Sequence, residues 1–460
     1  MEDLPHHLIL DILGRLADSA DVARCRTVSR TLNAVSRDVT SVTLLCSLSR
    51  YLRSRSSDAG SLVAPFKSVV ASSVLSWGSV DSVAIGIDGS LADSCEDMEE
   101  DDEAGDDMYL MDAGFLAGWL PRVGEGLKSL SISDFWVQSC WRRSDVLALV
   151  SSCCRNLCEL ELKNAWLSVD GLNPLPALTS LTLEFIRLDD ENLSKICTCF
   201  PLLQVLNLRG VGGLKEPKIH LPDLRSCQWT VSNVPLSLAI YAPRLVKLKL
   251  KCIKPKSLIL ETPALSDFDL SIVQADDLQV KDLISLESLK LDSPCLYNLI
   301  TAFRSGETVE KLTLNTEFNR HVEEMISLEL LFKTFPNASS LTIGPGTWSR
   351  LWPSPGSGEE KVGMKSLKGI VACMVVSHID VAQSFIAFIM DKCTNLSDFT
   401  MLVHQQHADS TLLSNLTKRC TADWPRLKWK FGVFKEATEA CGFTGGWDIV
   451  WQRQTFEGAR

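Results

Sequence analysis

The hexapeptides LCELEL (157–162), LTSLTL (178–183) and LQVLNL (203–208) share one pattern, with apolar residues at their first, fourth and sixth positions. Their last three residues alternate apolar, polar, apolar, which is the period-two pattern of a strand with one buried face. We therefore expect each hexapeptide to end in a short strand. Its leucines would point into the core, and the residues between them would face solvent.

This pattern, or a close apolar variant, recurs along most of the 460-residue chain. The copies begin at residues 127, 157, 178, 203, 224, 245, 265, 286, 309, 338, 367 and 396. Their spacing of 20 to 30 residues is that of leucine-rich repeats. VTSVTL at 39 and VDSVAI at 80 extend the series toward the N-terminus, and the alternation from Leu427 to Val433 predicts a closing strand.

One such unit cannot bury its apolar face alone, so the units must stack. The predicted fold class is α/β, a leucine-rich-repeat solenoid of the horseshoe type. Fifteen strands about 4.8 Å apart would line an inner arc of roughly 65 Å, which suits a protein partner better than a small molecule. Helical segments over 144–154, 189–200 and 381–393 would return along the convex side, whereas the repeats of 20 to 21 residues leave room only for a short turn there.

The acidic charge is concentrated in one segment. Asp93 to Asp112 holds 11 acidic residues and no Lys or Arg. This segment accounts for the whole net charge of −11, so the rest of the chain has a net charge of zero. We predict a solenoid over 41–420 with a disordered acidic insertion at 88–113. Residues 421–460 would form the closing strand and a cap, and a Gly- and Pro-rich loop at 345–361 would be irregular.

Several classes of function are disfavoured. A neutral body is a poor match for nucleic acid, and it offers no polybasic membrane anchor. The longest apolar runs are too short to cross a membrane, and the opening MEDLPHH is not a signal peptide. The sixteen cysteines show no metal-site spacing and are expected to be free thiols in the cytoplasm or nucleus. Gly210, Gly212 and Gly213 lack the spacing of a phosphate loop and predict a turn instead. We expect no cofactor, no metal and no catalytic site.

The first forty residues carry a different pattern. Pro5 suits the first turn of a helix. Five apolar residues share one face of that helix: Leu8, Ile9, Ile12, Leu13 and Leu16. Asp18 or Ser19 can cap a second helical segment. That segment carries Val22, Cys25, Val28 and Leu32. So small a helical unit must pack on the solenoid, on a partner, or on both.

These residues resemble the F-box, whose pattern is close to LPxxLxxxILxxL followed by a short gap and LxRCRxVSKxWN. Matching positions include Leu4-Pro5, Ile12-Leu13 and the run from Arg24 to Arg30. The usual Trp is Leu32 here and a usual Leu is Val22, and since both are apolar, we expect the helical unit to form with somewhat less contact area. With residues 1–40 as the F-box, the whole chain resembles the F-box/LRR proteins that are numerous in plants.

The resemblance implies a non-catalytic substrate receptor of an SCF ubiquitin ligase. The F-box would bind a Skp-type adaptor, and through it a cullin and a RING subunit, while the repeats would hold the protein destined for ubiquitination and proteasomal degradation. The adaptor-binding residues implied are Leu4, Pro5, Leu8, Ile12, Leu13, Val22, Cys25, Val28 and Ser29, some of which must instead hold the helices together. The alternative is an LRR interaction scaffold or ligand sensor that takes no part in ubiquitination.

Charged residues at outward strand positions are candidates for binding the substrate. They are Arg209, Lys247, Lys249, Lys251, Asp267 and Asp269. One interpretation is a patch for a partner of acidic or mixed charge. The other, which we favour, is that opposite charges one repeat apart neutralise each other.

Overall fold

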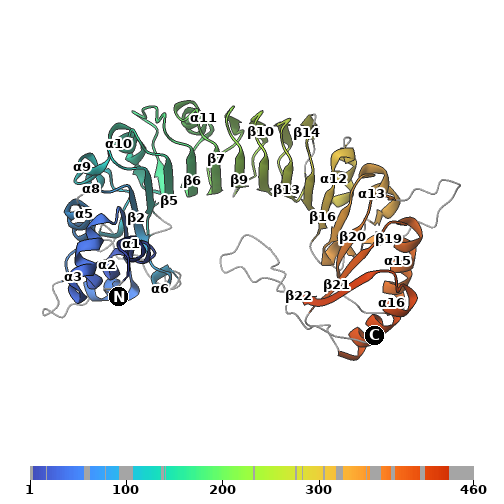
Figure 1. Cartoon of the computed structure of the whole chain (residues 1–460). Helices are drawn as coiled ribbons and strands as arrows, with labels where there is room; N and C mark the ends of the chain where they lie inside the picture. Colours follow the sequence, from blue (N-terminus) through green and yellow to red (C-terminus); the bar gives the residue numbers. More distant parts are fainter. Residues whose placement is uncertain are drawn as a thin grey trace. The chain divides into compact units, whose positions relative to one another are not determined.

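A computed structural model describes residues 4–16, 18–55, 63–77, 79–92, 107–135, 139, 141–231, 234–274, 277–281, 283–303, 306–316, 325–348, 350–352, 364–374, 379–404 and 410–434. The chain divides into two compact units, Met1–Leu245 and Val246–Arg460. Each unit is a stretch of leucine-rich-repeat solenoid, with a sheet of parallel strands backed by helices or short strands (Figure 1).

In the first unit, the repeat strands pair in the order of the chain, all parallel. They are β1 (Ser41–Cys46), β2 (Ser82–Ile87), β3 (Ser129–Ser133), β5 (Glu159–Leu167), β6 (Ser180–Arg187), β7 (Val205–Val211) and β9 (Ser226–Val231). The short strand β4 (Arg143–Ser144) also pairs with β5. Each repeat strand begins two residues into its sequence pattern, as predicted.

The second unit continues the same scheme within itself. Its strands are β11 (Lys247–Cys252), β13 (Asp267–Ile272), β15 (Ser288–Asp292), β16 (Lys311–Asn315), β18 (Ser340–Ile343), β20 (Gly369–Met374), β21 (Asp398–His404) and β22 (Lys428–Phe434). The leucines of the repeat pattern are buried, as Leu248 and Leu250 illustrate. In the described residues, the predicted strands are thus all present, with β22 at the place of the closing strand.

Helices pack behind these strands wherever a repeat is long enough to hold one. The first unit has α4 (Leu48–Arg55), α5 (Phe66–Ser76), α6 (Gly89–Ala92), α8 (Ala113–Ala117), α9 (Leu120–Val123), α10 (Val146–Cys153) and α11 (Asp190–Cys199). The second has α12 (Leu296–Ala302), the 3-10 turn η4 (Gly306–Thr308), α13 (Leu328–Thr334), α14 (Pro345–Trp348), α15 (Ile379–Lys392) and α16 (Ser410–Asp423). The three helical segments predicted by sequence correspond to α10, α11 and α15.

The short repeats differ from the prediction, because their outer side carries strands instead of turns. In the first unit, β8 (Lys218–His220) pairs in parallel with β10 (Ser237–Tyr241). In the second unit, β12 (Ser257–Glu261) pairs in parallel with β14 (Asp277–Lys281). A second parallel ladder satisfies the backbone where a repeat of about 20 residues is too short for a helix. A further parallel pair joins β17 (Ile326–Ser327) to β19 (Leu351–Trp352).

The predicted disordered insertion at 88–113 is too wide at both ends. Asp88 accepts a hydrogen bond from the Leu91 amide at 2.9 Å, next to α6. Asp107 accepts hydrogen bonds from the amides of Phe66 and Lys67 at 2.6 and 3.0 Å, at the start of α5. Three apolar residues after it are buried: Met108, Leu110 and Met111. Burial and capping therefore order these flanks, and the stretch 93–106 lies outside the described residues.

Two other predicted segments are only partly described. The loop predicted to be irregular at 345–361 begins with α14, whose Thr347 is fully buried, and continues into β19. Its remainder from 353 lies outside the described residues. The same holds for the predicted C-terminal cap after Phe434, at 435–460.

Three short helices precede the first repeat: α1 (His6–Gly14), α2 (Ser19–Val28) and α3 (Arg30–Val35), followed by the 3-10 turn η1 (Ser36–Asp38). Pro5 starts α1, and its carbonyl accepts hydrogen bonds from the amides of Leu8 and Ile9. Asp18 caps α2 by accepting from the Ala20 amide at 2.9 Å, and Ser29 caps α3 through the Thr31 amide at 3.2 Å. The small core of this helical unit contains Ile9, Leu13, Leu32, Val35 and Val39.

Candidate adaptor-binding and partner-binding surfaces

Helix α1 has two apolar faces, one buried and one open to solvent. Ile9 and Leu13 are each 2% exposed and belong to the core of the helical unit. Leu8 and Ile12 are each 42% exposed. They are four residues apart, so they lie on one face of the helix. A helix that needed only to cover the first repeat would have no reason to hold a second row of apolar side chains in water.

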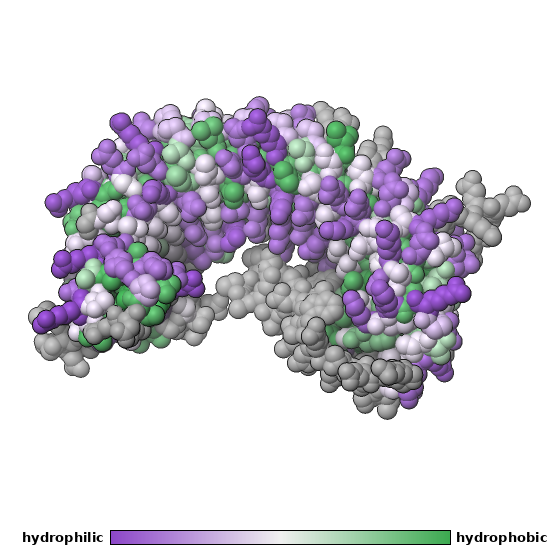
Figure 2. Space-filling model, viewed as in Figure 1, coloured by the Kyte–Doolittle hydropathy of each residue, from purple (hydrophilic) through white to green (hydrophobic). Residues whose placement is uncertain are grey.

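Two more apolar residues of the helical unit are exposed. Leu4 precedes α1, and Val28, the last residue of α2, is 79% exposed. We call Leu4, Leu8, Ile12 and Val28 the exposed apolar set. Figure 2 shows hydrophobic residues on the surface of the N-terminal helices, bordered by hydrophilic ones.

The other residues of the predicted adaptor-binding group lie elsewhere. Leu13 and Val22 are buried, Cys25 is half-buried and packs against the helical core, and Pro5 and Ser29 cap helices. Leu13, Val22, Cys25 and Ser29 therefore make structural contacts within the unit, whereas the Pro5 side chain is exposed between Leu4 and Leu8. Sequence reasoning placed buried and exposed residues together because the apolar positions of α1 form one broad stripe.

The helical unit is fastened to the first repeats by contacts that the sequence did not indicate. The Arg26 guanidinium lies over the Trp77 ring, 4.6 Å from its centre, and also donates to the Ser36 hydroxyl at 2.9 Å. Trp77 packs against the helical core from the end of α5. The Ser19 hydroxyl accepts a hydrogen bond from the Thr43 amide of β1 at 2.8 Å. The helices are thereby held in a fixed orientation on the solenoid of the first unit.

Near the helix ends, the polar contacts are local. His6 lies 3.2 Å from the Asp38 carboxylate of η1. Burial raises the pKa of the Asp18 carboxyl above its ordinary value, against the opposing effect of its capping hydrogen bond to Ala20. The His6 contact joins α1 to η1, whereas Asp18 acts at the start of its own helix, α2.

The charges on the inner strands of the first unit pair with one another. Lys163 of β5 lies 3.0 Å from Glu184 of β6, and Arg209 of β7 lies 3.6 Å from the same carboxylate. Arg209 also donates to the Gln228 amide oxygen of β9 at 3.3 Å. One carboxylate thus serves two cations.

In the second unit, three lysines of β11 stand opposite β13. Lys247 is in register with Asp267, and Lys249 is in register with Asp269. Lys251 is in register with Ser271. The Asp269 carboxylate also accepts from Lys290 of β15 at 3.1 Å. Opposite charges therefore alternate across these strands, which lowers the net field that a partner would meet.

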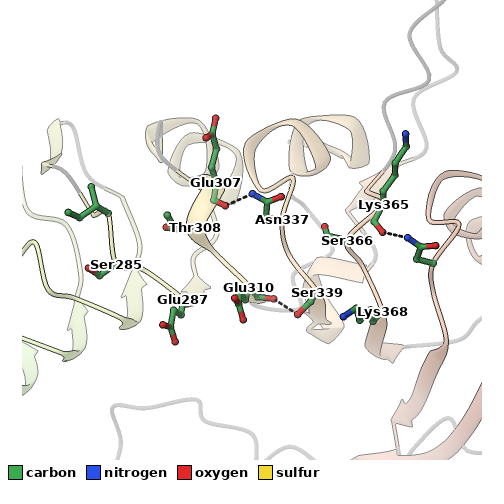
Figure 3. Close-up of a pocket in the computed structure, with 12 residues that line it drawn as sticks. Ser285, Glu287, Glu307, Thr308, Glu310, Asn337, Ser339, Lys365, Ser366 and Lys368 are labelled. Carbon is green, nitrogen blue, oxygen red and sulfur yellow. Dashed lines mark hydrogen bonds between the residues drawn. The ribbon is translucent and has the colours of Figure 1, made fainter.

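A hollow of about 810 Å³ lies in the second unit, along the N-terminal ends of β15, β16, β18 and β20 (Figure 3). None of the predicted site residues lines it. The Glu287 and Glu310 side chains point to the opposite side from the Glu307 side chain (Figure 3). The carboxylates thus diverge, which does not suit a catalytic or metal site.

Side chains in this hollow join successive repeats. The Asn337 amide donates to the Glu307 carbonyl at 2.8 Å, and the Asn395 amide donates to the Lys365 carbonyl at 2.7 Å. In the first unit, Asn156 makes the same contact with the Glu125 carbonyl at 2.8 Å. The acceptor lies 30 or 31 residues earlier in each case, so these amides tie one repeat to the one before it.

The cysteines in the described part of the chain are free, and eight of them are buried. Burial raises the pKa of the Cys227 thiol to about 12, as it does that of Cys252. Such thiols are unreactive and serve as small apolar residues. No group of residues suited to hold a metal ion occurs within the described ranges. Among the described helices, none is long and apolar enough to cross a membrane.

Comparisons with known proteins agree with this architecture. A family model described as F-box-like matches residues 1–42. A second model, described as "FBD-associated F-box protein At5g56370, LRR repeats", matches residues 116–343. The F-box/LRR-repeat protein At4g29420 of Arabidopsis thaliana is 47% identical over 448 residues, covering 95% of this chain and 99% of that relative.

Proposed function

Because this chain belongs to the F-box/LRR-repeat family, we propose that it is the substrate receptor of an SCF-type ubiquitin ligase. Its helical unit would bind a Skp-type adaptor, and its repeats would bind the protein to be ubiquitinated. The receptor would contribute proximity rather than chemistry, by raising the effective concentration of substrate lysines near the charged ubiquitin carrier. It would act in the cytoplasm or the nucleus, without a cofactor of its own.

The observation that carries the proposal is the exposed apolar set. Four apolar side chains in water cost free energy unless a partner covers them. The F-box-like match over residues 1–42 supports a Skp-type adaptor as this partner. Leu13 and Val22, which the sequence grouped with the adaptor-binding residues, are buried and would hold in place the helices that carry this surface.

The contacts of Arg26, Trp77 and Ser19 also support this proposal, because they attach the helical unit to the repeats. A receptor that delivers a bound protein to a ubiquitin carrier benefits from a fixed geometry between its adaptor-binding helices and the repeats next to them. The helical unit is joined to β1 and α5 by a hydrogen bond and a cation–π contact, not by a flexible linker.

The test is ubiquitin transfer in a reconstituted complex. The chain would be assembled with a Skp-type adaptor, a cullin and a RING subunit, and with a reporter peptide rich in lysine fused to its C-terminus. We expect ubiquitination of the reporter to fall to background with Leu8→Asp and to persist with Leu52→Asp, an equally exposed position on α4. Equal transfer by the intact chain and Leu8→Asp would contradict the proposal. Deletion of residues 1–40 is a poorer control, because it would uncover Trp77.

A further inference from the structure

Three residues with positive φ stand side by side where the inner strands of the first unit end. They are Asn164 (59°), Phe185 (51°) and Gly210 (61°). The register places Lys163 opposite Glu184 and Ala165 opposite Ile186, so Asn164 and Phe185 are neighbours. Gly210 follows Arg209, which is in register with Glu184. Left-handed backbone is ordinary for Gly and Asn, but a bulky residue such as Phe adopts it only at a cost.

The Phe185 ring is held in place although it is exposed. A Cβ atom on Gly210 would lie only 2.7 Å from the ring, so the ring lies against the glycine backbone. On another side, the Lys163 ammonium is 5.7 Å from the ring centre. Even so, the residue remains 44% exposed. The fold therefore presents a positioned aromatic ring to solvent.

The charges beside this ring are unbalanced. Lys163 and Arg209 share the single carboxylate of Glu184. Arg187, two residues after Phe185, stacks over the Trp166 ring at 4.6 Å and has no ion pair among the described residues. The carboxylates of Asp189 and Asp190, which follow Arg187 in the chain, accept hydrogen bonds from backbone amides, and among the described residues neither forms an ion pair with Arg187.

The Trp166 ring is itself part of a row across three strands. Arg143 of β4 is in register with Trp166 of β5, and Trp166 is in register with Arg187 of β6. Arg143 forms an ion pair with Asp170, so it is already neutralised. Among the ion pairs of the described residues, Lys163 and Arg209 thus share the Glu184 carboxylate, and Arg187 pairs with none.

We propose that Lys163, Trp166, Phe185, Arg187 and Arg209 form a docking surface for an acidic segment of a partner protein. Partner carboxylates would pair with the guanidinium groups of Arg187 and Arg209, in the bidentate geometry that Arg favours. An apolar side chain next to them would pack on Phe185. Exposed aromatic and Arg side chains are the residues most enriched among those that dominate binding energy. This inference rests on the proposed function in one respect: the acidic segment is taken to belong to the protein that is ubiquitinated.

The test uses the full chain in complex with a Skp-type adaptor as bait for a phage library of unmodified twelve-residue peptides. We expect the selected peptides to be enriched in Asp and Glu next to an aromatic or aliphatic residue. One labelled peptide is then titrated by fluorescence anisotropy against the variants. Binding should weaken at least about tenfold with Phe185→Asn and with Arg187→Ala. The Asn variant removes the ring while it tolerates the left-handed backbone, so a loss of binding is not a loss of folding.

Matched controls are available in the same unit. Leu202 is 45% exposed and Arg225 is exposed, and both precede inner strands instead of following them. Leu202→Ala and Arg225→Ala should bind the peptide as the intact chain does. A version of the peptide with Gln for Glu and Asn for Asp should lose binding, because its charge is gone.

The proposal would be overturned by a failure to select peptides, by peptides without acidic enrichment, or by equal binding of Phe185→Asn, Arg187→Ala and the intact chain. Adaptor binding is measured separately in the same preparations. A chain that binds the peptide but no adaptor would contradict the proposed function without contradicting the proposed docking surface.

Discussion

The Arg26 guanidinium of α2 lies over the indole ring of Trp77, at the end of α5. The two residues are 51 positions apart in the sequence, and they join the helical unit to the first repeats. Trp77 also packs against the core that contains Leu13 and Leu32. Leu32 fills the place where the F-box pattern usually has a Trp, so Trp77 supplies aromatic contact area to a helical unit that lacks that residue.

Trp77→Ala should therefore loosen the helical unit. The lost apolar contacts and the lost cation–π contact together predict a destabilisation of about 2 kcal/mol. Hydrogen exchange of the amides in α1 to α3 should speed up, while that of β11 to β15 in the second unit stays unchanged. Leu52→Ala, an exposed position on α4, is the control. Unchanged exchange in α1 to α3 would show that Trp77 does not support these helices.

The repeat-joining asparagines should contribute to stability although they are exposed. Asn337→Ala and Asn395→Ala each remove a hydrogen bond to a carbonyl of the preceding repeat. We expect each to lower the free energy of unfolding by about 1 kcal/mol. Urea denaturation of the full chain measures this. Asn298→Ala, at an exposed position of α12, should change stability by less than about 0.5 kcal/mol.

Gly213 should not tolerate a side chain. Its φ is 95°, and a Cβ atom there would lie 2.5 Å from the Leu188 carbonyl oxygen. Gly213→Ala should destabilise the chain by about 2 kcal/mol or more. Gly369→Ala, where a Cβ would meet nothing within 4 Å, should be close to neutral. Thermal unfolding that shifts equally in both variants would contradict this assignment.

The buried thiols should make the chain sensitive to alkali. Burial raises the pKa of Cys227 and Cys252 from an ordinary value near 9 to about 12. Below pH 9 the thiols are protonated in both states, so their contribution to stability is complete. As the pH rises from 9 toward 12, only the unfolded chain releases these protons, and that contribution is lost. Urea midpoints should fall over this range, with a shallower fall in the Cys227→Ala variant. An equal slope in both would argue against a buried Cys227 thiol.

The positions of the inner strands could be predicted from sequence because the apolar residues of the repeat pattern are the ones that form the core. Leu160, Leu181 and Leu206 recur at the same place in each repeat, and each is buried. The outer strands were missed because five-residue segments such as Ser257–Glu261 lie within repeats that were assigned only turns. The glycines at 210 to 213 were predicted to form a turn, but Gly210 lies in β7 at an irregularity of its pairing with β9, and Gly212 forms a parallel bridge with Arg187.

The site was less accessible to sequence reasoning. Periodicity grouped Leu8 with Leu13, and only the packing of α3 and Trp77 on one side of α1 separates the exposed residue from the buried one. Likewise, nothing in the sequence around Phe185 reveals that its ring rests on Gly210, because that contact depends on the register of β6 and β7. Which of these residues are exposed depends on contacts between segments far apart in the sequence, and a local sequence pattern does not reveal such contacts.

Leu8 and Leu13 offer the most direct test, since they are the same residue type on one helix with exposures of 42% and 2%. The measurement is the affinity of a Skp-type adaptor for the full chain, by calorimetric titration, with the intact chain, Leu8→Ala and Leu52→Ala. We predict that Leu8→Ala weakens binding at least about tenfold without a change in the free energy of unfolding. Leu13→Ala, in contrast, should lower that free energy by about 2 to 5 kcal/mol. No binding by the intact, folded chain, or equal binding by Leu8→Ala, would contradict the account.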